Sequence, residues 1–131
     1  MTRAIARRAL IASALLTAGA ALAQTPSSRP IKLVVPFGAG TTTDIVGRTL
    51  ADALGRQLGQ AVIVENKPGA GGAIGSEQVA KSGTDGQTLL LGTVGTHAIN
   101  PSLYKRLTYQ PLRDFAPLGF IGATPTLLVV P

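Results

Sequence analysis

Two stretches of the chain carry uncharged hydrogen-bond donors where a small molecule could be held. The first stretch follows an apolar, β-branched segment, Ile31–Val35, which predicts a buried strand ending before Pro36. It precedes a segment that predicts a helix from Asp44 to about Leu58. N–H groups and hydroxyls at the start of a helix attract anions. We therefore expect this stretch to hold an anion or a polar small molecule without a charged side chain, and its candidate residues are Phe37, Gly38, Ala39, Gly40, Thr41 and Thr42.

The second stretch runs from Thr93 to Asn100, after a predicted strand at 88–91. If both strands belong to one parallel sheet, both stretches lie at its carboxyl-end edge, where ligands bind in open α/β sheets. Topology alone therefore places them on the same side of the molecule. The candidate ligand-binding residues here are Thr93, Gly95, Thr96, His97 and Asn100.

Asp44 has two interpretations. The more economical is the N-cap of the helix, because an aspartate there accepts a backbone N–H near the helix start. The other is a ligand contact. Its negative charge disfavours a phosphate, whereas a carboxylate held by neutral donors or through water is compatible with it.

The sequence offers no catalytic or metal-binding constellation. His97 is the single histidine and cysteine is absent, so neither a metal site nor a Cys–His pair is predicted. No Gly-x-Ser-x-Gly motif and no suggestive pair of acids occurs. We expect a protein that is not an enzyme, with no catalytic residues, metal or cofactor. His97 is then a loop or helix-cap residue, or a residue of this loop that contacts the ligand.

Two glycine-rich segments have alternative interpretations. Gly38-Ala39-Gly40 partly matches a dinucleotide fingerprint, but Thr43 stands where the third glycine belongs, and no Gly-Lys-Ser/Thr phosphate loop exists. The second segment, Pro68–Gly72, is either a further anion cradle or, as is commoner, a mobile connection.

The order of elements predicts the fold that must position these stretches. Further strands are expected at 61–64 and 88–91, separated by a long flexible turn at 65–72 and a helix at 73–82 with Ile74 and Val79 inward. Strand–helix–strand alternation with short connections predicts a mostly parallel α/β sheet with flanking helices. A short helical turn at 101–104 and an irregular segment at 105–117 follow, and then strands are expected at 118–121 and 126–130.

The first residues predict an export signal. Arg3, Arg7 and Arg8 form a basic region, an apolar run covers 9–20, and Ala21-Leu22-Ala23 is a typical cleavage site. Arg7-Arg8 is also compatible with twin-arginine export. Residues 1–23 are thus expected to be removed, leaving nine basic and six acidic residues. Such a scattered balance does not favour nucleic acid as a partner.

Taken together, the sequence resembles the periplasmic substrate-binding proteins of tripartite tricarboxylate transporters, the Bug family of TctC-like receptors. In this family two adjacent glycines are usual in the first loop, and here the second is Thr41, which adds a hydroxyl. The segments that carry the resemblance are 30–37, 38–44, Gly59-Gln60, 64–72, Asp85-Gly86, 88–92, 96–104, 114–117 and 127–131.

The resemblance implies a type II periplasmic-binding-protein fold of two lobes that close like a Venus flytrap. Residues 24–124 would form the first lobe, truncated where 125–131 begin the crossover to a missing second lobe. The implied ligand is a small organic acid such as a di- or tricarboxylate, the implied partners are the transporter's membrane permease subunits, and the full-length protein would be a monomer. An alternative function is an exported ligand-sensing domain that feeds a two-component signalling system.

Two expectations concern the fragment itself. Two loops on one open lobe provide few hydrogen bonds, so the chain alone is expected to bind its ligand weakly or not at all. Thr126–Val130 is apolar and β-prone without its partners, so it is expected to behave as an aggregation-prone edge.

Overall fold

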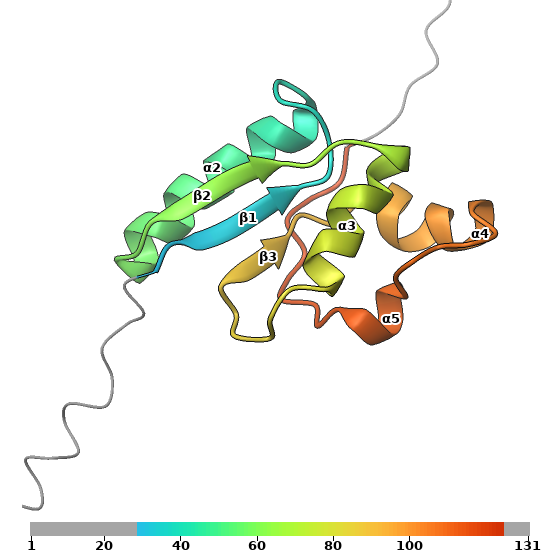
Figure 1. Cartoon of the computed structure of the whole chain (residues 1–131). Coiled ribbons are helices and arrows are strands. Elements are labelled where there is room, and N and C mark those ends of the chain that lie inside the picture. Colours follow the sequence, from blue (N-terminus) through green and yellow to red (C-terminus); the bar gives the residue numbers. More distant parts are fainter. Residues whose placement is uncertain (1–28, 125–131) are drawn as a thin grey trace, which may run out of the picture.

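The computed structural model describes residues 29–124 (Figure 1). The predicted leader (1–23) and the predicted strand at 126–130 lie outside these residues. The described elements are β1 (Ile31–Val35), α2 (Thr42–Leu58), β2 (Val62–Asn66), the 3₁₀ turn η2 (Ala70–Gly72), α3 (Ala73–Ala80), β3 (Thr88–Leu90), the π-helical turn η3 (Gly95–Ile99), α4 (Asn100–Leu103) and α5 (Pro111–Asp114).

The three strands form one parallel sheet in the order β2-β1-β3. Leu33, at the centre of β1, is paired with Val64 on one side and Leu89 on the other. The predicted parallel α/β sheet is confirmed. The second strand is longer than predicted, because Glu65 and Asn66 continue the ladder opposite Val34 and Val35.

Helices α2 and α3 cover opposite faces of the sheet (Figure 1). This follows from the strand order, since right-handed crossovers to β2 on one side of β1 and to β3 on the other place their helices on opposite faces. Leu33 and Val35 point toward α2 and pack with Ala51 and Leu91 in the core. Gly47 brings α2 close, because a Cβ there would lie 2.8 Å from Val35 Cγ2.

The helix faces differ in part from those predicted. Val46, Leu50 and Leu54 are half-buried, but Leu58, at the end of α2, is 51% exposed. Ile74, expected inward, is 52% exposed, because Gly75 and Ser76 are the residues of α3 that face the sheet. A Cβ at Gly75 would lie 3.0 Å from Pro36 Cα, so that face has no room for a large side chain.

Two segments depart from their predicted conformation. The predicted flexible turn at 65–72 contains the end of β2 and the 3₁₀ turn η2. Gly69, just before η2, and Gly71 and Gly72 within it adopt positive φ angles of 133°, 60° and 86°. These angles explain the glycines, since other residues rarely adopt them. The predicted strand at 118–121 is wrong: this segment pairs with no described strand, and Leu118 and Phe120 are exposed.

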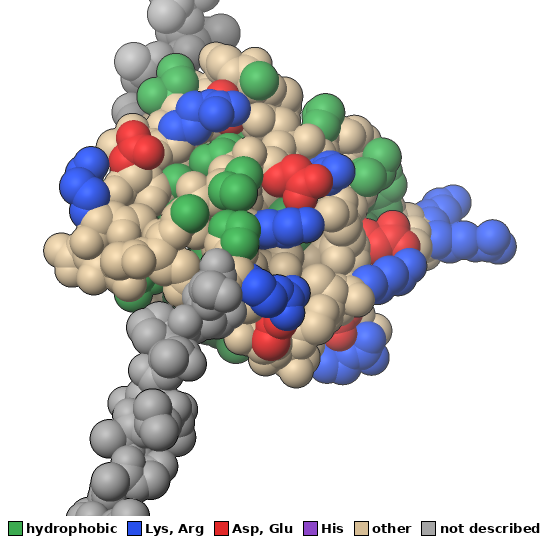
Figure 2. Space-filling model, turned by 60° about the vertical axis from the view of Figure 1, so that its left-hand side comes forward, with side chains coloured by type: hydrophobic (Ala, Val, Ile, Leu, Met, Phe, Trp, Pro, Cys, Tyr) green, Lys and Arg blue, Asp and Glu red, His purple; other side chains and the backbone are tan. Residues whose placement is uncertain are grey.

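The charged side chains are mixed over the surface. On the face in Figure 2, Lys and Arg side chains alternate with Asp and Glu side chains instead of gathering in one patch. Lys67, for example, pairs with Glu65 at 2.8 Å. Within residues 29–124, no helix is long and apolar enough to cross a membrane.

Candidate functional site

The two donor-rich stretches meet at one edge of the sheet, as the topology predicts. Since β1 and β3 are parallel neighbours, the chain leaves both at the same edge. The glycine turn η2 lies between the stretches: a Cβ at Gly72 would be 2.6 Å from Thr96 Cγ2 and 3.3 Å from Phe37 Cζ. Three segments therefore converge here, and Pro68–Gly72, for which a mobile connection was the commoner interpretation, packs between the two stretches.

The first loop is closed by Thr41, which is the N-cap of α2 in place of the predicted Asp44. Thr41 Oγ1 donates to the Gly38 carbonyl at 2.8 Å and accepts the Asp44 N–H at 3.4 Å. Threonine fills this role well because its hydroxyl satisfies a donor that the helix leaves unpaired. The hydroxyl that departs from the family pattern is thus used inside the loop.

Asp44 is buried and its carboxylate binds back to the loop. Oδ2 accepts the Gly40 N–H at 2.8 Å and Arg48 Nε at 3.0 Å, and Oδ1 accepts Asn66 Nδ2 at 2.9 Å. The hydrogen bond from Arg48, then those from Gly40 and Asn66, lower the pKa of Asp44 to about 2. Asp44 therefore stays ionised and holds the loop in place.

Asn66 extends this network from the end of β2. Its Nδ2 also donates to the Phe37 carbonyl at 3.0 Å, and its Oδ1 accepts Arg48 Nη2 at 3.1 Å. We call Asp44, Arg48 and Asn66 the charged clamp. Sequence analysis did not single out Asn66 for this role, although its position just after the predicted strand at 61–64 was a usable signal.

Hydrogen bonds within the first loop and to the charged clamp determine which of the loop's donors are free to bind a ligand. The Gly40 N–H and the Thr41 hydroxyl are both occupied. In contrast, the N–H groups of Gly38 and Ala39, and those of Thr42 and Thr43 in the first turn of α2, bond to no group in the described part of the chain. These are the donors that the first loop offers to a ligand.

The second loop is closed by a pair of threonines. The Thr93 N–H donates to Thr96 Oγ1 at 2.9 Å, and this hydroxyl lies 3.1 Å from the Thr93 carbonyl and 2.8 Å from His97 Nδ1. Thr96 is fully buried, so its side chain is structural. The N–H groups of Val94 and Gly95, at the start of the turn, bond to no other described group.

His97 packs within the unit. Its ring lies 5.1 Å from that of Phe115, centroid to centroid. A Cβ at Gly92 would lie 2.7 Å from His97 Cε1, so the ring occupies the space that this glycine leaves. Partial burial lowers the pKa of the imidazole. Among residues 29–124, no three His, Asp or Glu side chains come together as metal ligands would.

A buried polar network supports the second loop from behind. Tyr109 donates its hydroxyl to the Thr96 carbonyl at 2.6 Å, and Asn100 Nδ2 donates to the Gly71 carbonyl at 3.0 Å and to Tyr109 Oη at 3.4 Å. We call Thr96, Asn100 and Tyr109 the buried network. Tyr109 was missed because it lies in a segment interpreted as irregular. A lone tyrosine among polar residues was the available signal.

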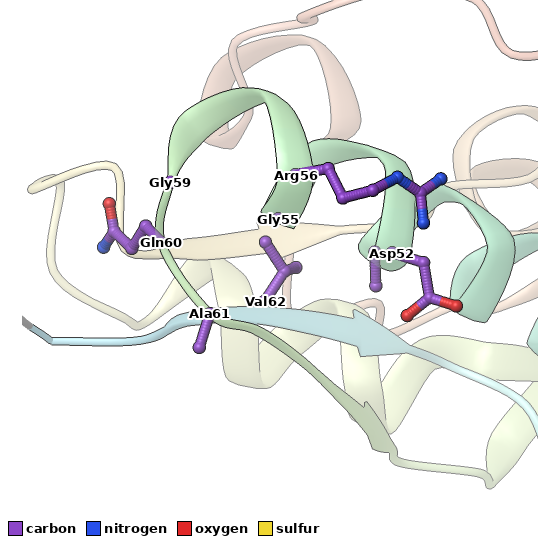
Figure 3. Close-up of a pocket in the computed structure, with 8 residues that line it drawn as sticks. Asp52, Gly55, Arg56, Gly59, Gln60, Ala61 and Val62 are labelled. Atoms are coloured by element: carbon purple, nitrogen blue, oxygen red, sulfur yellow. The ribbon is translucent and has the colours of Figure 1, made fainter.

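A separate open hollow lies at the opposite edge of the sheet, between the end of α2 and the start of β2 (Figure 3). Asp52 and Arg56 project beside it from α2. None of the predicted site residues lines it, and its lining residues are Ala51, Asp52, Gly55, Arg56, Gly59, Gln60, Ala61 and Val62.

Comparison with known proteins identifies the class. Residues 46–131 match the tripartite tricarboxylate transporter family receptor, TctC. The chain is 42% identical to Protein BugT of Bordetella pertussis, over 98% of this chain and 40% of BugT. This chain therefore belongs to the TctC family of receptors. Because the matching family is one of transporter receptors, the prediction that the chain is not an enzyme is confirmed.

Solved structures agree with the fold. The periplasmic binding protein BugD is 48% identical with a TM-score of 0.67, over 71% of this chain and 30% of BugD. MatC from Rhodopseudomonas palustris, with bound malate, is 39% identical with a TM-score of 0.67, over 70% of this chain and 31% of MatC. The predicted periplasmic-binding-protein fold class is confirmed, and the chain spans about 40% of the length of BugT.

Proposed function

We propose that this chain supplies the first lobe of a periplasmic receptor for a small organic acid, a di- or tricarboxylate. The receptor would deliver the acid to membrane permease subunits of a tripartite tricarboxylate transporter. Family membership supports the class of function, and MatC, a relative, is described with bound malate. The observation that carries the proposal is the convergence of two loops with free, uncharged N–H donors at one sheet edge.

The geometry favours a carboxylate over a more highly charged anion. The free N–H groups of Thr42 and Thr43 lie in the first turn of α2, where the helix dipole attracts negative charge, and those of Gly38 and Ala39 lie in the loop just before it. Ionised Asp44 lies in the same turn and repels it. A carboxylate, with one charge and two acceptor atoms, gains the hydrogen bonds and suffers the smaller repulsion.

The first lobe alone is expected to bind weakly. A neutral hydrogen bond contributes about 1 kcal/mol net, whereas micromolar affinity requires about 8 kcal/mol. A few donors on one open surface therefore support a dissociation constant of about a millimolar or weaker. A millimolar dissociation constant corresponds to a binding free energy of about 4 kcal/mol. Tighter binding requires a second lobe that excludes water.

The test is a titration of the ¹⁵N-labelled chain with malate, followed by amide chemical shifts. We expect shifts at Gly38, Ala39, Val94 and Gly95 at millimolar malate, and none with dimethyl malate, which lacks the charges. Shifts confined to the hollow of Figure 3, or none at all, would contradict the proposal.

A pair of threonine variants sharpens this test. Thr42→Val removes a hydroxyl from the first turn of α2 while keeping the side-chain shape, and we expect it to weaken the malate response. Thr49→Val is the matched control, because the Thr49 hydroxyl donates to the Ile45 carbonyl within the same helix. Equal responses in the two variants would count against a site at the start of α2.

We also propose that residues 1–23 direct the chain to the periplasm and are removed after Ala23. The Sec and twin-arginine routes both fit the basic residues before the apolar run. N-terminal sequencing of the exported protein should begin at Gln24. Export in a strain that lacks the twin-arginine translocase would assign the route to Sec.

A further inference from the structure

The Thr96 carbonyl is left without a helical partner by the sequence around it. In η3 the Asn100 N–H donates to the Gly95 carbonyl, five residues earlier, which is the π-helical pattern. The next bond of that pattern would join the residue at position 101 to the Thr96 carbonyl. Position 101 is proline, which has no N–H. A fully buried carbonyl is therefore orphaned within its own turn.

Tyr109 supplies the missing donor. Its hydroxyl lies 2.6 Å from the Thr96 carbonyl, and the side chain is only 2% exposed. Its ring meets that of Phe115 edge to face at 5.9 Å, and the Phe115 ring in turn contacts His97. The hydroxyl is thereby fixed from two directions, at a place that water does not reach.

The same hydroxyl joins the turn to the neighbouring glycine turn. Asn100, 3% exposed, contacts Tyr109 Oη and the Gly71 carbonyl with one amide group. A Cβ at Gly71 would lie 3.3 Å from Asn100 Oδ1, so the two turns are in close contact. Displacement of the Tyr109 hydroxyl would therefore disturb both η3 and η2.

We propose that Tyr109 is a positioning residue of the ligand site. It holds η3 in the π-helical form and so sets the direction of the free Val94 and Gly95 N–H groups. Tyr109 touches no ligand itself, since its hydroxyl is buried behind the loop. The ligand part of this proposal rests on the proposed function above, whereas the local order of the turn does not.

The experiment compares Tyr109→Phe with Tyr104→Phe, the same change at the only other tyrosine of the chain. Tyr104 is exposed, and its hydroxyl makes no hydrogen bond within the described residues. Two quantities are measured: hydrogen exchange of individual amides and the malate dissociation constant from chemical shifts. In Tyr109→Phe we expect about tenfold faster exchange at His97 and Asn100, with α2 amides unchanged. We also expect the malate dissociation constant to rise about threefold, which corresponds to about 0.65 kcal/mol.

A rescue variant separates positioning from general stability. Pro101→Ala restores an N–H opposite the Thr96 carbonyl, so Tyr109→Phe combined with Pro101→Ala should recover most of the exchange protection and malate affinity. Faster exchange at all amides alike, or no rescue, would overturn the proposal, as would identical behaviour of the two tyrosine variants. If Tyr109→Phe loses protection in η3 but the wild type itself binds no malate, the proposed function alone is refuted.

Discussion

The two loops of the candidate site are held by opposite kinds of chemistry. The first loop is held by the charged clamp, in which buried Asp44 binds Arg48, whose side chain is largely exposed. The second loop is held by the buried network, whose members carry no charge. The candidate site thus has one loop held by a charged cluster near solvent and the other held by uncharged hydrogen bonds inside the protein.

This difference predicts different sensitivities. Ion pairs near the surface weaken with salt and with protonation, and they contribute little when isolated. Hydrogen bonds between buried neutral groups do not depend on salt. However, leaving one buried polar group without its partner destabilises the fold by the full desolvation penalty of that group. Changes in the buried network should therefore cost the most stability, and changes in the clamp should depend most on conditions.

The largest effect is expected for Asn100→Ala. This change removes the donor to the Gly71 carbonyl and leaves a small cavity beside Tyr109. We expect a loss of about 2–3 kcal/mol in the free energy of unfolding, measured by urea denaturation. Ser102→Ala, an exposed neighbour in α4, is the control and should change it by less than about 0.5 kcal/mol. A small effect of Asn100→Ala would remove the distinction between the two supports.

A smaller effect is expected for Gly92→Ala, which tests packing in the second loop. The added methyl would lie 2.7 Å from His97 Cε1, so the ring must move, at a cost of about 1–2 kcal/mol. Combination with His97→Ala removes the clash and should make the two changes non-additive. Additive effects in the double-mutant cycle would show that His97 does not confine this position.

Next in size is Asn66→Ala in the charged clamp. It leaves the Phe37 carbonyl without a donor and releases Arg48 from β2. We expect a loss of about 1 kcal/mol in the free energy of unfolding. Amide exchange should become faster in residues 37–41 and stay unchanged in η3. Gln78→Ala, an exposed amide on α3, is the control. Loss of protection in both loops would mean that the supports are coupled.

The smallest effect is expected for Arg48→Met, and it should be present at neutral pH and shrink toward acid pH. The pKa of Asp44 is about 2 in the folded protein and near 3.9 when unfolded. Its stabilising contribution is therefore present above about pH 4 and is lost as the pH falls toward about 2. Without Arg48, the largest cause of the shift, the pKa of Asp44 in the folded protein lies closer to its unfolded value, so the stability lost in acid is smaller and the loss is complete at a higher pH. Acid denaturation curves measure this, and Arg106→Met is the exposed control.

The position of the candidate site could be predicted from the sequence, whereas the hydrogen bonds that hold its loops could not. Strand–helix alternation determined that both loops leave parallel neighbours, and this followed from apolar runs such as Ile31–Val35 alone. In contrast, the partner of the Phe37 carbonyl is Asn66, 29 positions away. Such pairings depend on the register of β1 with β2, which short-range patterns do not specify.

Local patterns also failed where tertiary packing decides. Ile74 was expected inward by its apolar character, but the glycine and serine of α3 allow closer approach to Pro36 and turn Ile74 outward. Asp44 was expected to cap α2 because aspartate prefers that position, yet Thr41 lies one turn earlier and takes it. In both cases a neighbouring residue with the weaker intrinsic preference takes the position, because the packing of the folded chain places it there.

The adjacency of β1 and β3 has a consequence for molecular size. Neighbouring strands lie about 4.8 Å apart, and the two loops leave the sheet at this interval. The backbone, which side-chain substitutions leave in place, thus brings the starting points of the two loops within about the breadth of a single acid head group. Under the proposed function, this unit grips one end of its ligand whatever the ligand's length. Selection between short and long acids must then arise beyond it.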